Sequence, residues 1–206
     1  MKLYGFPPSP NTWKVRAAAL QMSLPVPLQL VDLSKGEQRS EAYLALNPCG
    51  RAPVLVDGDF KLWESNAILQ YLAAKAKTPL WPDDPRARAD IMRWQSWQLA
   101  HWHPAVTPMI FENVVKPVVL KAGEPDQAVI ARTTEAFHKE AAVLDKSLAG
   151  RSYLVGDTLT LADFAVAAPL FYAEQAKIPV ASYANIRRWF GAQAALPAWQ
   201  ETAPKM

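Results

Sequence analysis

The chain has 206 residues, of which 50% are hydrophobic and 20% are charged, so it can bury a sizeable core. This length suits one large domain or two small ones, and the composition excludes an intrinsically disordered chain. The net charge is +3, and no run of lysine and arginine is long enough to indicate a nucleic-acid partner.

A single cysteine, Cys49, excludes an internal disulfide and a CxxC redox pair. Free cysteines usually behave as small buried hydrophobes, so we expect Cys49 to be a packed thiol. The N-terminus has no signal-peptide core, and no apolar stretch approaches the roughly 18 residues of a membrane span. We therefore expect a cytoplasmic protein with no membrane partner.

The first part of the chain alternates strand-like and helix-like patterns. The expected elements are strands over 2–6 and 27–33, helices over 11–22, 40–47 and 65–76, and a hairpin over 52–63. Asp57-Gly58 marks the hairpin turn, because glycine accepts a positive φ there. A crossover helix between two strands implies parallel pairing, and the hairpin adds an antiparallel pair.

Residues 77–88 are rich in proline and polar side chains, and they predict a linker between the two parts of the chain. No strand pattern follows this linker. Helical spacing instead predicts an all-α second part, with helices over 85–102, 126–150, 160–171 and 183–196.

The segment LTLADF (159–164) has the signature of a helix N-terminus. Thr160 is the expected N-cap, and Asp163 can reach back to it. Leu159 and Phe164 occupy the positions of a hydrophobic staple. We therefore interpret Asp163 as a folding residue rather than a catalytic one.

Glu64 and Ser65 follow the hairpin at the start of a predicted helix. A helix N-terminus carries unpaired N–H groups and partial positive charge, which suits a carboxylate. Ser65 adds a hydroxyl donor and Glu64 can take an ammonium, so the pair can hold both ends of an amino-acid group. The alternative is an ordinary serine cap with an acidic first turn.

Ser9 follows two prolines where the first strand ends. A nucleophilic serine would need a base, and no Gly-x-Ser-x-Gly elbow surrounds it. A hydroxyl donor beside a helix N-terminus would instead favour a bound thiolate and lower the pKa of that thiol. The alternative is a simple helix cap or turn residue.

Three segments together resemble the cytosolic glutathione transferases, in their bacterial, theta-, phi- and nu-like serine types. They are SPNTWKV (9–15), LNPCGRAPVLVDGDFKLWESNAILQYLA (46–73) and LVGDTLTLADFAVA (154–167). The resemblance covers nearly the whole chain and implies an α/β plus all-α fold. A thioredoxin-like, glutathione-binding domain over 1–78 would be followed by an all-helical domain over 85–206 that forms the electrophile site.

The resemblance implies a glutathione transferase, which activates the glutathione thiol for attack on an electrophilic small molecule in detoxification. Glutathione is then the co-substrate. Ser9 matches the thiol-activating serine of the theta- and phi-like classes. Asn11 matches an asparagine of the nu-like members, which can share or take the sulfur contact.

The resemblance also implies where the tripeptide binds. Pro53 matches the family's cis-proline, next to which the Ala52 backbone would bind the cysteinyl part. The γ-glutamyl group and the glycine carboxylate would be held by two further pairs, respectively Glu64 with Ser65 and Gln38 with Arg51.

We expect the second substrate in an apolar cleft between the domains. Its candidate walls are Phe6, Trp97, His101, Trp102, Met109 and Phe111. The tryptophan spacing is equally that of a core or dimer stripe. His101 and His103 point in different directions on a helix, and no carboxylate follows at ligand spacing, so we expect no metal.

Two alternatives to conjugation stay open. One is a glutathione-dependent disulfide-bond reductase or peroxidase of the nu-like type, in which Asn11 contacts the sulfur. The other is a non-catalytic transferase-like scaffold, because fold alone does not determine function. The resemblance also implies a homodimer, and the charge pattern leads us to expect no nucleic-acid partner.

Overall fold

The computed structural model describes residues 1–204, which form two compact units. Unit 1 comprises Met1–Pro82 together with the C-terminal segment from Leu196 onward. Unit 2 comprises Asp83–Ala195. The sequence had suggested that all of 85–206 forms the second domain, whereas the structure groups the C-terminal segment with unit 1.

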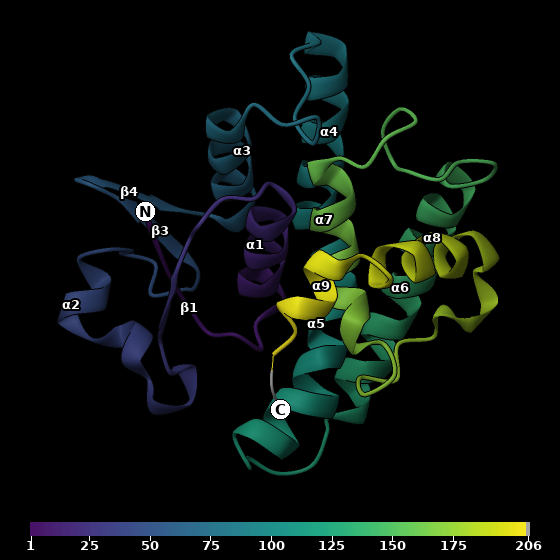
Figure 1. The fold of residues 1–206 in the computed structure, drawn as a ribbon. Coiled ribbons are helices and arrows are strands. Elements are labelled where there is room, and N and C mark those ends of the chain that lie inside the picture. Colours follow the sequence, from purple (N-terminus) through teal and green to yellow (C-terminus); the bar gives the residue numbers. More distant parts are fainter. Residues whose placement is uncertain (205–206) are drawn as a thin grey trace. The chain divides into compact units, whose positions relative to one another are not determined.

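Unit 1 is built on a four-stranded mixed sheet, whose strand order is β2-β1-β3-β4. The first two strands pair in parallel, and the other pairs are antiparallel. Figure 1 shows α1 and α3 on one side of the sheet and α2 on the other. The elements are β1 (Lys2–Gly5), α1 (Pro10–Gln21), β2 (Leu28–Leu30), α2 (Glu41–Leu44), β3 (Val54–Asp57), β4 (Phe60–Trp63) and α3 (Ser65–Ala76).

This arrangement confirms the predicted thioredoxin-like α/β part. The hairpin turn lies where the sequence placed it: Asp57 pairs with Phe60, and Gly58 between them has a φ of 63°. Gly5 is the last residue of β1. It lies so close to α1 that an added Cβ would come within 2.6 Å of the Thr12 side chain. A glycine is therefore required at the end of β1, where the connection to α1 begins.

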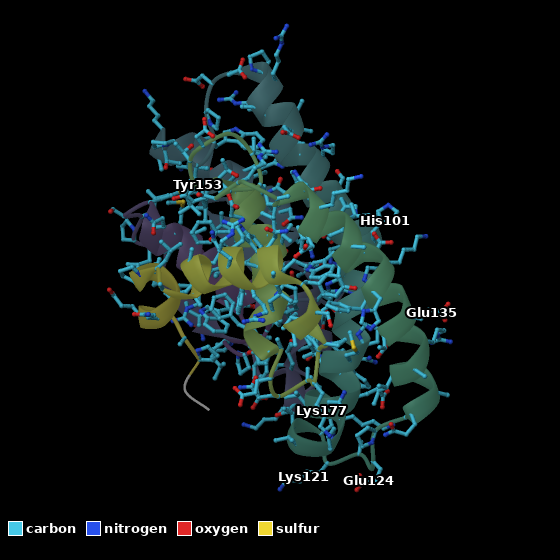
Figure 2. The ribbon with its side chains drawn as sticks, turned by 90° about the vertical axis from the view of Figure 1, so that its right-hand side faces the viewer. His101, Lys121, Glu124, Glu135, Tyr153 and Lys177 are labelled. Carbon is cyan, nitrogen blue, oxygen red and sulfur yellow. The ribbon has the colours of Figure 1, made fainter. Side chains whose placement is uncertain are left out.

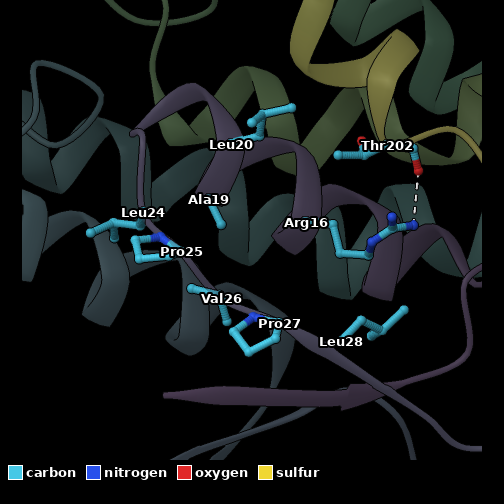
Figure 3. Close-up of a pocket in the computed structure, with 9 residues that line it drawn as sticks. All are labelled: Arg16, Ala19, Leu20, Leu24, Pro25, Val26, Pro27, Leu28 and Thr202. Carbon is cyan, nitrogen blue, oxygen red and sulfur yellow. Dashed lines mark hydrogen bonds between the residues drawn. The ribbon is translucent and has the colours of Figure 1, made fainter.

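The C-terminal segment is tied to α1 by two side chains. The indole N–H of Trp13 donates to the Thr202 hydroxyl at 3.1 Å and to the Trp199 carbonyl at 3.3 Å. The Arg16 guanidinium donates to the Thr202 carbonyl at 2.9 Å, at the edge of a mainly apolar pocket of about 420 Å³ (Figure 3). These bonds, together with helix α9 (Pro197–Glu201), explain why the segment belongs to unit 1.

Unit 2 is all-helical, as predicted. The long helical run that begins at Pro85 continues well past residue 102, through two π-helical stretches over Gln98–Trp102 and Phe111–Val119. Pro108 and Pro117 lie inside this run and remove backbone donors, which accords with the wider turns. The α-helices are α4 (Pro85–Trp97), α5 (His103–Ile110), α6 (Gln127–Ser147), α7 (Leu161–Ala167) and α8 (Ala184–Ala194).

The structure also contains short 3-10 helices, over Leu33–Lys35, Glu37–Arg39, Ala168–Tyr172 and Val180–Ser182. Within the part of the chain that the structure describes, no helix combines the length and apolarity needed to cross a membrane.

The predicted helix start at Thr160 is confirmed as a structural device. Asp163 is fully buried and accepts hydrogen bonds from the Thr160 backbone and hydroxyl at 2.9 and 3.1 Å. The same carboxylate accepts from the Leu154 backbone at 3.0 Å and from the Trp189 indole at 2.9 Å. One acidic side chain therefore holds α7, the preceding loop and α8 together.

Candidate active site

Ser9 lies at the N-cap of α1, at the end of a tight turn. Its backbone N–H donates to the Phe6 carbonyl at 2.9 Å, and Pro10 occupies the first helical position. The Ser9 side chain makes no capping hydrogen bond to the helix. Ser9 is thus the cap residue by position and through its backbone, while its hydroxyl remains available to a ligand next to the positive end of α1.

Glu64 and Ser65 stand at the start of α3, as predicted, but their local roles differ from the cap alternative. The N-cap is Glu64, whose φ of 68° is rare for a residue with a side chain. Ser65 is the first helical residue and is 5% exposed. The exposed Glu64 carboxylate and the positive N-terminal end of α3 offer a site for an ammonium and a carboxylate.

A side-chain hydrogen bond connects these two helix starts. The Ser65 hydroxyl donates to the side-chain oxygen of Asn11 at 3.2 Å. With that oxygen engaged, the N–H groups of the Asn11 amide are left to face other groups. The bond therefore places an amide donor from α1 next to the first turn of α3.

The loop before β3 carries Pro53, whose peptide bond with Ala52 is cis. Two buried side chains hold this loop by the carbonyl of Arg51. The Asn47 amide donates to it at 2.7 Å and the Tyr43 hydroxyl at 3.0 Å. The backbone of Ala52 is thereby fixed next to the sheet.

Gln38 and Arg51 lie in different surroundings. Gln38 sits in the 3-10 helix Glu37–Arg39, and its side-chain oxygen is buried without a hydrogen-bond partner among the described residues. An amide oxygen accepts hydrogen bonds, so this atom would need a ligand donor, and only the N–H groups of the same amide could donate to a ligand carboxylate. Arg51 is exposed and makes no ion pair with a described residue.

Sequence reasoning missed two residues at this site, Lys14 and Asn66. Lys14 lies on α1 with no exposed surface, and its ammonium donates to the side-chain oxygen of Asn66 at 2.7 Å. Burial lowers the pKa of Lys14 to about 7, and the charge of Glu64 opposes this shift. The sequence offered no signal for Lys14, because α1 also carries Arg16 and helical spacing did not show which of the two basic side chains is buried.

The expected electrophile residues do not all present a surface. Trp102 and Met109 are 0% and 1% exposed, and Trp102 stacks on Trp97 and donates to the Val166 carbonyl at 3.1 Å. These two residues are buried in the core of unit 2, so neither offers exposed surface to a substrate. The physical reason is that aromatic residues at helical spacing share one face of the helix, and this face packs against the neighbouring helices of unit 2.

The other expected wall residues keep some exposed surface. Phe111 is 43% exposed, and Phe6 and Trp97 are half-buried. His101 is exposed on the helical run, where Figure 2 shows its side chain at the surface of that run. His103, two residues on, lies 3.0 Å from the Thr107 hydroxyl through its Nδ1.

Cys49 is exposed, so its expected role as a packed thiol was wrong. The Asn47 side chain accepts from the Cys49 backbone N–H at 2.9 Å. Cys49 is not among the buried residues of the nearby small core, which are Val31, Tyr43 and Val54.

Comparison with known proteins agrees with this geometry. Residues 1–74 match the family model for the N-terminal domain of glutathione S-transferases, and residues 103–197 match the model for the C-terminal domain. The chain is 38% identical to "Glutathione S-transferase 3" of Zea mays, over 98% of this chain and 92% of that protein. It is 36% identical to "Glutathione S-transferase hmp2" of Hypomyces subiculosus, over 97% and 95% of the two chains.

Solved structures show the same likeness. The glutathione transferase F7 of Populus trichocarpa superposes with a TM-score of 0.91 at 30% identity, covering 98% of this chain and 97% of that one. A glutathione S-transferase I bound to lactoylglutathione gives a TM-score of 0.87 at 28% identity, covering 98% and 97%.

Proposed function

The chain belongs to the glutathione S-transferase family and is a glutathione transferase, and from this premise we propose that the Ser9 hydroxyl activates the glutathione thiol. The observation that carries the proposal is the Ser9 side chain at the N-cap of α1, which makes no hydrogen bond to its own helix. An O–H donor and the positive helix end both favour a thiolate over a thiol.

The activated sulfur then performs the transfer. The thiol proton is released to solvent, and a sulfur lone pair forms the new bond to an electrophilic carbon, from which a leaving group departs with the bonding pair. A drop of one unit in the pKa of the thiol is worth about 1.4 kcal/mol and raises the thiolate fraction at neutral pH nearly tenfold. Holding the thiolate against its partner supplies the remaining acceleration.

The tripeptide is proposed to bind along the first unit's site residues. Glu64 takes the ammonium of the γ-glutamyl group, and the first turn of α3 with Ser65 takes its carboxylate. The Ala52 backbone, set by the cis bond to Pro53, binds the cysteinyl part. The glycine carboxylate is assigned to the last pair, Gln38 and Arg51.

The electrophile is proposed to contact the expected residues that keep exposed surface. Phe6 and Phe111 supply apolar area, and His101 supplies a polar group. Trp97 donates its indole N–H to Glu140 at 3.2 Å and keeps one half-buried edge. An apolar site with few polar groups suits a hydrophobic substrate.

Glutathione-dependent disulfide reduction is the second candidate, and the position of Asn11 favours it. Its oxygen is held by Ser65, so its N–H groups can contact a sulfur in place of Ser9. In that reaction the thiolate attacks one sulfur of a disulfide, a mixed disulfide forms, and the other sulfur leaves as a thiolate.

Two matched variants separate these candidates. Ser9→Ala is expected to raise the pKa of bound glutathione, read from thiolate absorbance in the ultraviolet, and to lower kcat for conjugation about 100-fold with little change in glutathione Kd. Asn11→Ala is the control. A loss of conjugation confined to Asn11→Ala would rule out the serine mechanism.

A scaffold without catalysis is tested by calorimetry with reduced glutathione. Saturable binding that Ser65→Ala weakens supports the tripeptide site, and no heat at any concentration would leave only a partner-binding role.

We further propose a cytoplasmic location and a homodimer. The edge strand β4 carries Phe60 and Trp63, which are 44% and 38% exposed, and a second copy would cover such apolar surface.

A further inference from the structure

Lys14 is a charged side chain placed directly behind the first turn of α3. It has no exposed surface, and its Nζ lies 2.7 Å from the side-chain oxygen of Asn66, which is itself 6% exposed. Asn66 follows Ser65 in the chain, and Glu64 precedes them both. The Lys14 ammonium therefore contacts the first turn of α3 from the interior of the protein. The γ-glutamyl group is assigned to the same turn.

The charges around Lys14 are few. Among the described residues, the Glu64 carboxylate at the start of α3 is the charged group whose field raises the pKa of Lys14, against the larger effect of burial. The helices that pack most extensively on α1 are α3 and α9. The other charged groups on these three helices lie elsewhere: Arg16 bonds Thr202, Lys75 pairs with Asp57, and Glu201 is exposed.

A buried ammonium next to a helix N-terminus is unfavourable in the empty protein. Burial removes its hydration, and the positive end of the helix repels it. A ligand carboxylate bound at that turn reverses the local charge. The same carboxylate then stabilises the ammonium, because opposite charges at short distance favour the ionised form.

On the basis of the proposed function, we infer that Lys14 is a positioning residue whose protonation is coupled to glutathione binding. Protonated Lys14 orients Asn66 through a charge-assisted hydrogen bond and adds positive potential behind the γ-glutamyl carboxylate. It touches neither the thiol nor the electrophile. Its contribution is to the affinity for glutathione and not to the bond-forming step.

Linkage fixes the sign of the effect. If bound ligand increases the proton affinity of Lys14, then protonated Lys14 increases the affinity for the ligand by the same factor. In the free protein the pKa of Lys14 is about 7, so affinity is greatest below that pH and declines above it. The decline is about tenfold for each unit by which the ligand raises the pKa.

The test uses S-methylglutathione, which keeps the net negative tripeptide but has no thiol to titrate. We would measure its Kd by calorimetry from about pH 6 to about pH 8.5, a window that contains the lysine titration. Each Kd is corrected for the fraction of ligand whose own α-ammonium, the group assigned to Glu64, is still protonated at that pH. Wild-type Kd should rise across this window. Runs near pH 7.5 in two buffers of different ionisation enthalpy should show proton uptake on binding.

Three variants assign the effect. Lys14→Arg keeps a permanent charge and should give a flat profile, since arginine does not titrate in this range. Lys14→Met removes the charge and should give a flat profile with weaker binding at the acid end. Lys2→Met, which removes an exposed lysine at the start of β1, should keep the wild-type profile.

Three results overturn the inference. A flat wild-type profile without proton uptake, in a protein that binds S-methylglutathione, removes the coupling and leaves the proposed function intact. A slope that persists in Lys14→Arg and Lys14→Met assigns the proton to another group. A wild-type protein that binds no S-methylglutathione at any pH would overturn the proposed site and this inference together.

Discussion

The Ser65 hydroxyl donates to the side-chain oxygen of Asn11 at 3.2 Å, and this bond joins the first turns of α3 and α1. Ser65 belongs to the proposed γ-glutamyl site, and Asn11 to the proposed sulfur site. A ligand carboxylate that accepts from Ser65 competes with Asn11 for the hydroxyl. Occupation of one end of the tripeptide site therefore alters the amide at the other end.

A double-mutant cycle on these two residues tests that relationship. Ser65→Ala should weaken glutathione binding about tenfold. Asn11→Ala should change it less, because the substitution removes the proposed sulfur contact but also frees the Ser65 hydroxyl for the ligand. The double variant should depart from additivity by about 0.5–1.5 kcal/mol, because the two side chains share one hydrogen bond. Calorimetric Kd values for the four proteins give the coupling, and strict additivity would show that the bond has no role in binding.

Lys14 should also make folding stability depend on pH. Burial lowers its pKa to about 7 from the 10.5 of an ordinary lysine, so the unfolded chain holds the proton more tightly between these values. The free energy of unfolding therefore rises with pH above about 7 and levels off near the unfolded-state pKa, and the gain is lost as pH falls back through 7.

Lys14→Met removes this contribution. The difference in unfolding free energy between wild type and variant should move in favour of the wild type by about 1.4 kcal/mol per pH unit above the folded-state pKa. Urea denaturation at about pH 6, 7.5 and 9 measures it. Parallel pH profiles for the two proteins would contradict the assignment of a titrating Lys14.

Asp163 should be the most costly single truncation in unit 2. Asp163→Ala leaves the N–H groups of Leu154, Thr160 and Trp189 buried without an acceptor. Such a loss is expected to cost about 3–5 kcal/mol. Asp163→Asn keeps one acceptor oxygen and should cost less. Equal midpoints for the two variants in urea would contradict this account.

The hydrogen bonds from the Trp13 indole to the C-terminal segment should stabilise unit 1. Trp13→Phe keeps most of the ring but removes the N–H that bonds Thr202 and Trp199, which should cost about 1–2 kcal/mol. Trp63→Phe is the matched control, because Trp63 is 38% exposed. Thermal unfolding that shifts equally for both variants would show that these hydrogen bonds contribute nothing beyond ring volume.

Cys49 should react as a surface thiol. A chromogenic disulfide reagent is expected to modify it without denaturant, because its side chain is exposed. Cys49→Ser should change the free energy of unfolding by less than about 0.5 kcal/mol, as is usual at exposed positions. Modification that requires denaturant would indicate a covered thiol.

Local patterns in the sequence determined much of the fold. Alternating apolar residues around Asp57-Gly58 specified the hairpin, and LTLADF specified the start of α7, because turns and caps depend on neighbours within a few residues. Glu64 and Ser65 were also identified locally, as a pair at the start of a predicted helix, whereas Gln38, Arg51 and Ala52 were implied by the resemblance to the glutathione transferases.

The tertiary structure decided what lies beyond that range. It directed Cys49 outward, drew Trp102 and Met109 into the core of unit 2, and joined the C-terminal segment to α1 through Trp13. It also buried Lys14 against Asn66, 52 positions away in the chain. Helical spacing tells which residues share a face, but only tertiary packing determines which elements that face contacts. The pKa of a lysine depends on those contacts, because they decide its burial and its neighbouring charges.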